Sequence, residues 1–161
     1  QKRIPGQSEN VPPIRNIWGE PVRDEGYWLS KLANPFRTSK LTKDPATIAV
    51  FETRARIISP SESIGSIPMT MDEYEMFVEM KGKVAKGVIS DYVASKLYQQ
   101  DSPELRKEQI EAIDREVNRE AREWIEEFVY ERVRREGYSD EDYERMRKGY
   151  MEIPEELSDG R

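Results

Sequence analysis

The stretch between Pro103 and Gly137 contains no glycine or proline, and it constrains the fold more than any other part of the chain. Ser102 is a suitable N-cap, Pro103 fits the first helical position, and Gly137 can adopt the left-handed conformation that ends a helix. From Ile110 onward apolar residues recur with a helical period at Ile113, Val117, Ala121, Trp124 and Phe128. The pattern predicts one amphipathic helix over residues 103–136, roughly 50 Å long. We expect a small domain to leave part of this stripe uncovered, so that it meets another chain or a second copy.

Composition agrees with long amphipathic helices around a thin core. Of 161 residues, 36% are hydrophobic and 36% are charged, against ordinary values of about 45–50% and about 25%. Residues 1–68 hold 10 Lys and Arg against 7 Asp and Glu, whereas the rest of the chain is acidic and brings the net charge to −6. This length allows one domain, or a small domain with an arm.

Residues 1–43 are rich in proline and glycine and carry isolated apolar side chains, which excludes a long helix or a central strand. The segment is too aromatic for a solvated linker. We interpret it as an extended arm with anchors at Ile17, Trp18, Trp28 and Phe36. Two arrangements fit: the arm docks on a partner through these side chains, or it folds back over the helices of its own chain.

Capping signals divide the remainder into short helices. Asp44-Pro45 starts a helix over about 45–58, and Thr70 with Glu73 forms a capping box that starts another over about 70–82. Gly82 is expected to end that helix, and a further one covers about 84–98. Residues 59–68 are predicted to be a loop, and we find no β-hairpin signal. Residues 44–136 thus form a helical domain, and residues 137–161 a short helix with a mobile acidic tail. The predicted fold class is mainly α.

The chain contains no histidine and no cysteine, which excludes thiol and Ser-His nucleophiles, disulfides and the usual zinc sites. Paired carboxylates such as Glu126-Glu127 are better explained as solvated faces. There is no phosphate-binding glycine motif and no apolar run long enough for a membrane span. We expect no catalytic, cofactor-binding or metal-binding residue here; any enzymatic activity would lie in domains outside this segment. Because the chain begins at Gln1, we also expect a piece of a longer or trimmed polypeptide.

The arm contains an unusual string, Ile14-Arg-Asn-Ile-Trp-Gly-Glu-Pro-Val22, followed in order by Asn34-Pro35-Phe36, Asp44-Pro45, Thr70-Met-Asp-Glu-Tyr74 and Gly82. This succession resembles the C-terminal region of very large bacteriophage virion proteins, which are described as internal, ejection, tape-measure-like or large polyvalent proteins. The sequence departs from the pattern at Met71 and Asp72, and the tail after Gly137 lies outside it. The resemblance carries no catalytic residue onto this chain.

The resemblance implies a role in the virion or in genome delivery, with presence in the host cytoplasm during assembly. Our first hypothesis is a non-catalytic assembly module of a structural or DNA-ejection protein. Its partners would be portal, tail or internal proteins, or copies of itself. The arm anchors would dock on a neighbour, and four residues of the long helix would line a helix–helix contact: Ile113, Val117, Trp124 and Phe128.

The alternative hypothesis is a nucleic-acid-associated virion protein that contacts packaged or transiting DNA through its basic N-terminal part. The arginines of the long helix offer it little support, because glutamates such as Glu116 and Glu120 are interleaved with them. This hypothesis predicts DNA binding that weakens steeply with salt.

Overall fold

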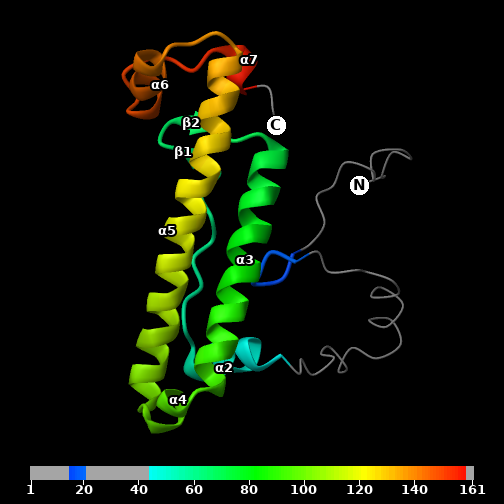
Figure 1. The fold of residues 1–161 in the computed structure, drawn as a ribbon, viewed down its shortest axis with the longest axis vertical. Helices are drawn as coiled ribbons and strands as arrows, with labels where there is room; N and C mark the ends of the chain where they lie inside the picture. Colours follow the sequence, from blue (N-terminus) through cyan, green and yellow to red (C-terminus); the bar gives the residue numbers. More distant parts are fainter. Residues whose placement is uncertain (1–14, 21–43, 159–161) are drawn as a thin grey trace, which may run out of the picture.

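The computed structural model describes residues 15–20 and 44–158, and these are mainly helical (Figure 1). Two long helices, α3 (Met71–Ala94) and α5 (Pro103–Arg135), lie side by side and antiparallel, and the short α4 (Lys96–Gln100) lies at the turn between them. The fold class predicted from the sequence is confirmed. The arm over residues 1–43 lies outside the described residues, except for residues 15–20.

Helix α5 begins and ends close to where its caps predict. The Ser102 side chain accepts a hydrogen bond from the backbone N–H of Leu105 at 3.2 Å, and Gly137 follows the helix with a φ of 93°. Part of its stripe stays uncovered as expected, since Phe128 is 40% exposed, and the contact of that part with another chain stays a prediction. The rest of the stripe is buried or half-buried. Helix α3 covers it because residues 71–94 form one helix, not two.

The predicted break at Gly82 is therefore wrong, although the capping box that starts α3 is confirmed. Thr70 accepts from the N–H of Glu73, and the Glu73 carboxylate accepts from the N–H of Thr70. Gly82 is buried in the middle of the helix. The backbone of Trp18 packs against Gly82 and leaves no room for a side chain there.

Helix α2 (Pro45–Thr53) is shorter than the predicted 45–58. Asp44 caps its start as expected, but Arg54 adopts the left-handed conformation with a φ of 56° and ends it. Residues 55–62 then run in a non-helical path between α3 and α5, and the chain turns back in a small hairpin (Figure 1). Tertiary contacts of this path, described below, replace the last helical turn that the sequence favoured.

The hairpin of β1 (Ser63–Ile64) and β2 (Ile67–Pro68) was missed by the sequence analysis, which predicted a loop over 59–68. Ile64 pairs with Ile67 across an antiparallel register, and both side chains are fully buried. Gly65 supplies the positive φ in the turn, at 55°. Two residues per strand are too few for an alternating pattern to reveal.

The C-terminal part is packed through Ser158, so the expectation of a mobile tail is wrong for the residues described. After α6 (Asp140–Arg147), the chain returns to the end of α5 and forms α7 (Glu155–Ser158), whose Leu157 is buried. Tyr138 donates a hydrogen bond to the Glu156 carboxylate, which raises the pKa of Tyr138 to about 12. The tail is acidic, yet one apolar side chain and this contact hold it in place.

The core consists of two clusters, one towards each end of the α3–α5 pair. The first joins Phe77 to the hairpin isoleucines, to α6 and α7, and to four positions of α5: Ala121, Ile125, Val129 and Val133. The second joins α2 and the second half of α3 to the first half of α5: Ala46, Ala49, Val50, Ala85, Ile89, Ile110, Val117, with Trp18 from the N-terminal part.

Candidate functional site

Residues Asn16 to Glu20 form a compact turn, and Asn16 organises it. The Asn16 side-chain oxygen accepts from the backbone N–H groups of Trp18 and Glu20, at 2.9 and 3.0 Å. Its amide donates to the Glu20 carboxylate at 2.9 Å, and its main chain bonds with Gly19 and Glu20. Gly19 takes a φ of 74°, which a side chain would disfavour. We call this segment, with Arg15, the N-terminal turn.

The N-terminal turn is docked on α3 and α2 by Trp18. The indole is 2% exposed, and its N–H donates to the Thr47 hydroxyl at 2.8 Å. The Trp18 backbone lies directly on Gly82: a Cβ at that position would be 1.5 Å from the Trp18 carbonyl oxygen. A Cβ on Gly19 would be 2.1 Å from Val78. Two glycines thus allow the turn and the helix to approach closely.

Charged pairs surround this contact. Arg15 lies 3.2 Å from Glu75 and 3.7 Å from Glu79, and Glu20 lies 2.9 Å from Lys86. The pKa of Glu20 is held below its ordinary value, first by the hydrogen bond from Asn16 and then by the one from Lys86. These pairs are partly exposed, so they contribute little stability individually and instead fix the orientation of the turn.

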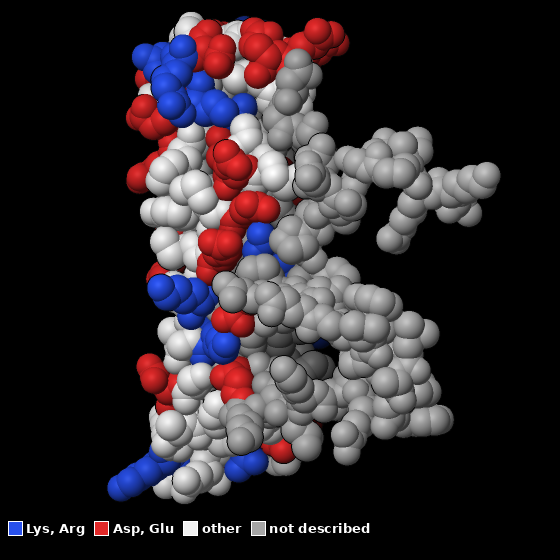
Figure 2. All heavy atoms as spheres, turned by 90° about the vertical axis from the view of Figure 1, so that its right-hand side faces the viewer, with Lys and Arg blue, Asp and Glu red and all other residues white. Residues whose placement is uncertain are grey.

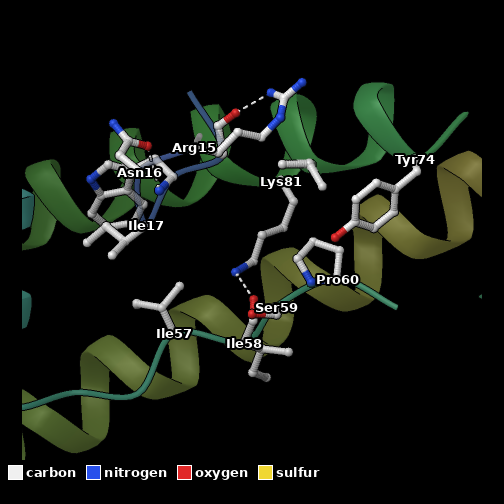
Figure 3. A pocket seen from close by; sticks show the side chains of 12 residues that line it. Arg15, Asn16, Ile17, Ile57, Ile58, Ser59, Pro60, Tyr74 and Lys81 are labelled. Carbon is white, nitrogen blue, oxygen red and sulfur yellow. Dashed lines mark hydrogen bonds between the residues drawn. The ribbon is translucent and has the colours of Figure 1, made fainter. Parts of the chain in front are cut away.

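A cavity of about 270 Å³ lies beside the docked turn, between it, the path over residues 57–60 and α3 (Figure 3). Tyr74, Val78 and Lys81 line it from α3. Figure 3 shows the Lys81 side chain extending towards the carbonyl oxygen of Ile58, to which it donates at 2.6 Å. The Lys81 ammonium is therefore committed to the chain's own contacts and is not a free cation for a ligand.

Lys81 also forms a buried ion pair, with its Nζ 2.6 Å from the Asp114 carboxylate on α5. The other Asp114 oxygen accepts from the N–H of Ile58 at 2.7 Å, and Glu111 accepts from the N–H of Arg56 at 2.9 Å. Both polar groups of the Ile58 backbone are thus satisfied by these two charged side chains. This network holds residues 55–59 away from helical geometry and explains why α2 ends at Arg54.

A second charged network closes the other end of the pair. The Arg132 guanidinium binds Glu73 at 2.6 Å and donates to the carbonyl oxygens of Pro68 and Leu157, at 2.7 and 3.2 Å. One side chain thereby joins α3, α5, the hairpin and α7. Because Glu73 is also the capping-box residue, the start of α3 is fixed by both local and tertiary contacts.

On the opposite side of the α3–α5 pair, an apolar strip remains partly open to solvent. Its members each precede a buried residue of the same helix: Met76, Met80, Val84 and Val88 on α3, and Trp124 and Phe128 on α5. In two antiparallel helices that face each other, the residues that precede the buried positions lie on one common side of the pair. The residues that follow the buried positions lie on the other side. Val78 and Gly82 are of this second kind, and they contact the N-terminal turn. Trp124 and Phe128 stack edge to face, with ring centroids 4.8 Å apart.

Exposure differs along this apolar strip. Phe128 is 40% exposed and Val88 is 42% exposed, whereas Met76, Met80 and Trp124 are half-buried against the first core cluster. The four members on α3 are spaced by four residues, so they follow one another along the same side of that helix. Rows of this kind are typical of protein–protein contact sites.

The four residues predicted for a helix–helix contact have different environments. Val117 is buried in the second cluster of its own chain, and Ile113 is half-buried beside it. Trp124 and Phe128 belong to the apolar strip, and Ile113, which precedes buried Asp114, lies on the same side of α5. From the sequence, Val84 and Val88 were expected to face inward on a separate helix, but both are partly exposed. The break expected at Gly82 hid that they continue the row of Met76 and Met80.

The four predicted arm anchors, Ile17, Trp18, Trp28 and Phe36, also differ in what the structure shows of them. Trp18 lies in this chain's own core, which is the folded-back arrangement and not the partner-docking one, while Ile17 beside it is 39% exposed. Trp28 and Phe36 lie outside the described residues. The sequence analysis identified the segment around Trp18 as an anchor, but it could not predict that this segment packs on Gly82 of α3.

A shallow acidic hollow of about 360 Å³ lies where α5 meets α6, lined by Glu123, Glu126, Glu127, Tyr130 and Tyr143. Tyr143 donates to Glu126, and burial together with this carboxylate raises its pKa. Arg147 neutralises part of the hollow at 3.0 Å from Glu126. Across residues 15–20 and 44–158, no group of acidic side chains is arranged to hold a metal ion.

No helix in the described part of the chain is both long and apolar enough to cross a membrane. Comparison of the chain with protein-family models, with curated proteins and with solved structures finds no match.

Proposed function

We propose that this chain is a non-catalytic assembly module of a phage virion protein, structural or involved in DNA ejection. It would act in the virion and, during assembly, in the host cytoplasm. Its partners are other virion proteins, such as portal, tail or internal proteins, or copies of itself. The observation that carries the proposal is the apolar strip: six apolar side chains stay partly open on a helix pair whose other side is filled by its own chain.

The rigidity of the helix pair supports this role. The Lys81–Asp114 pair and the Arg132–Glu73 pair both connect α3 to α5, one near each core cluster. A preorganised surface loses little conformational entropy when a partner binds. Aromatic side chains such as Trp124 also dominate the affinity of many protein interfaces.

The sequence resemblance gives the proposal its biological setting. Within the string that carries it, Asn16, Trp18, Gly19 and Glu20 each have a defined contact in the docked turn, and Gly82 is the helix position on which the turn rests. These separate motifs therefore belong to one packed unit.

The test compares Phe128→Glu with Phe51→Glu by light scattering coupled to gel filtration. Phe51 on α2 is 65% exposed but lies outside the strip, so it receives the same chemical change on another surface. We expect the wild-type chain to associate as its concentration rises, Phe128→Glu to remain monomeric, and Phe51→Glu to behave as wild type. Phe51→Glu should unfold near the wild-type temperature, because that side chain is largely solvated already. Phe128→Glu should unfold at a somewhat lower temperature, because it also removes the stacking on Trp124, but it should keep the wild-type helical content.

Heteromeric contacts need a second readout. A photo-crosslinking amino acid at position 128, in particles that contain the full protein, should capture a virion protein. The same group at Arg119, which lies on the exposed side of α5 turned away from α3, should not. A wild-type chain that is monomeric at all concentrations, together with no cross-link from position 128, would contradict the proposal.

A further inference from the structure

We propose that the N-terminal turn is a transferable ligand, and that its docking site on α3 and α2 can be filled by the turn of a second copy of this chain. This inference concerns the side of the helix pair opposite the apolar strip and does not depend on the assembly role proposed above. It assigns to Gly82, Thr47 and Lys86 the role of a peptide-recognition site.

The turn has the properties of a self-contained ligand. Hydrogen bonds among Asn16, Trp18, Gly19 and Glu20 connect the turn to itself, so much of its conformation is set by local contacts. Preorganisation of this kind lowers the entropic cost of binding. One aromatic side chain enters the protein, and the charged groups remain at the edge.

The docking site on α3 and α2 has features that match the side chains of the turn. It combines a gap above Gly82 into which no side chain projects, a hydroxyl acceptor on Thr47 for the indole N–H, and charges of opposite sign on either side: Glu75 and Glu79 for Arg15, and Lys86 for Glu20. A different sequence would leave the indole pocket empty or place like charges together. The site therefore recognises the order Arg-Asn-x-Trp-Gly-Glu.

The covalent connection does not determine which copy supplies the turn. Residues 21–43 join the turn to the N-cap of α2, and at about 3.3–3.6 Å per residue such a segment can span roughly 75 Å. Yet the indole N–H of Trp18 bonds Thr47, three residues after Asp44, so the two ends lie close together. A tether of this length permits identical elements to exchange between protomers with the same contacts. It also keeps the chain's own turn near the site at an effective concentration of about 1 mM or below, so a second copy fills the site when the chain's own turn cannot.

The first experiment uses a labelled peptide with the sequence of residues 14–22 and the full chain carrying Trp18→Ala, whose own turn can no longer fill the site. We expect saturable binding in fluorescence anisotropy. A peptide with alanine in place of tryptophan should bind at least ten-fold more weakly. Gly82→Ala in the same chain should abolish binding, since the new Cβ would overlap the Trp18 carbonyl.

Gly19→Val provides a second way to empty the site without truncating the tryptophan, because this change strains a φ of 74° and overlaps Val78. The same peptide should bind this variant as well. Absence of binding to both emptied variants would overturn the proposal.

The second experiment mixes two full-length variants that complement each other. Trp18→Ala keeps a working site, and Gly82→Ala keeps a working turn, so neither can dock its own turn. Both carry Phe128→Glu, which keeps contacts of the apolar strip out of the readout. At concentrations where the peptide saturates, the mixture should give a species of twice the 18.9 kDa chain mass in native mass spectrometry. If only the two separate chains appear there, a second copy does not supply the turn and the proposal is overturned.

Discussion

At the scale of single residues, the most informative position is Gly82. Glycine inside a helix costs about 1 kcal/mol relative to alanine, and this cost led the sequence analysis to end the helix there. The structure shows the compensation: the backbone of Trp18 occupies the space of a side chain. The helix tolerates the glycine because the docked turn needs it.

Gly82→Ala should therefore destabilise the chain, although alanine favours the helix. We expect a net loss of about 1–2 kcal/mol in the free energy of unfolding, because undocking a buried tryptophan outweighs the gain in helix propensity. Gly87→Ala is the matched control: nothing lies within 4 Å of its Cβ position, so it should stabilise by up to about 1 kcal/mol. Urea denaturation measures both, and equal effects would contradict the docking.

Asp114 provides the second residue-scale prediction. It is fully buried and holds both Lys81 and the N–H of Ile58. Asp114→Ala should cost about 3–5 kcal/mol, because it leaves a buried ammonium without its partner. Glu111→Ala, one turn earlier, removes an exposed hydrogen bond to the same path and should cost only about 1 kcal/mol. Comparable losses in thermal or urea unfolding would show that the buried pair has no special role.

At the scale of elements, each boundary reflects a competition between local signals and distant partners. The helix starts follow local capping, since the side chains of Asp44, Thr70, Ser102 and Ser139 all bind backbone N–H groups of the following turn. The end of α2 and the continuation of α3 through Gly82 follow tertiary contacts instead. Arg54 ends α2 because residues 56 and 58 bind Glu111 and Asp114 of α5, which are more than fifty residues away.

The N-terminal turn should undock in acid. Its folded state holds the pKa of Glu20 below the ordinary value of 4.5. A group with a lowered pKa in the folded state stabilises above its unfolded pKa, and the contribution is lost as the pH falls through the folded value. Docking should thus be unaffected by this group above pH 4.5 and should weaken below it.

Fluorescence of Trp18 can follow this undocking once the other two tryptophans are replaced by Trp28→Phe and Trp124→Phe. The emission should shift to longer wavelength as the pH falls. Because the carboxylates of Glu75 and Glu79 also lie beside the turn, paired with Arg15, the comparison with Glu20→Gln isolates the contribution of Glu20. An identical pH profile in that variant would contradict the assignment.

At the scale of the whole molecule, the fold is an antiparallel helix pair with two different sides. One side is filled by the chain's own N-terminal turn and by residues 55–60, and the other exposes the apolar strip. Figure 2 shows Lys and Arg intermixed with Asp and Glu over the face in view. Arg15, the only basic residue of the described N-terminal turn, is already paired with two glutamates.

DNA binding is the readout that separates the assembly proposal from its nucleic-acid alternative. With a net charge of −6 and its arginines interleaved with glutamates, the chain should not bind a labelled duplex even at low salt, because repulsion offsets attraction to phosphates. A gel-shift titration at about 50 mM salt measures this. Binding that weakens steeply as salt rises would favour the alternative instead.

The sequence by itself determined the helical class, the start of each main helix and the full extent of α5, because capping and periodicity act within a few residues of each other. The tertiary structure alone decided that α3 continues through Gly82, that α2 stops at Arg54, that Ile64 and Ile67 form a hairpin, and that Trp18 belongs to the core. Each of these depends on a partner distant in sequence: Trp18 for Gly82, Asp114 for residue 58, and the first core cluster for the isoleucines. The apolar strip became recognisable only when two helices were placed side by side, since neither helix reveals on its own which of its apolar residues the other will cover.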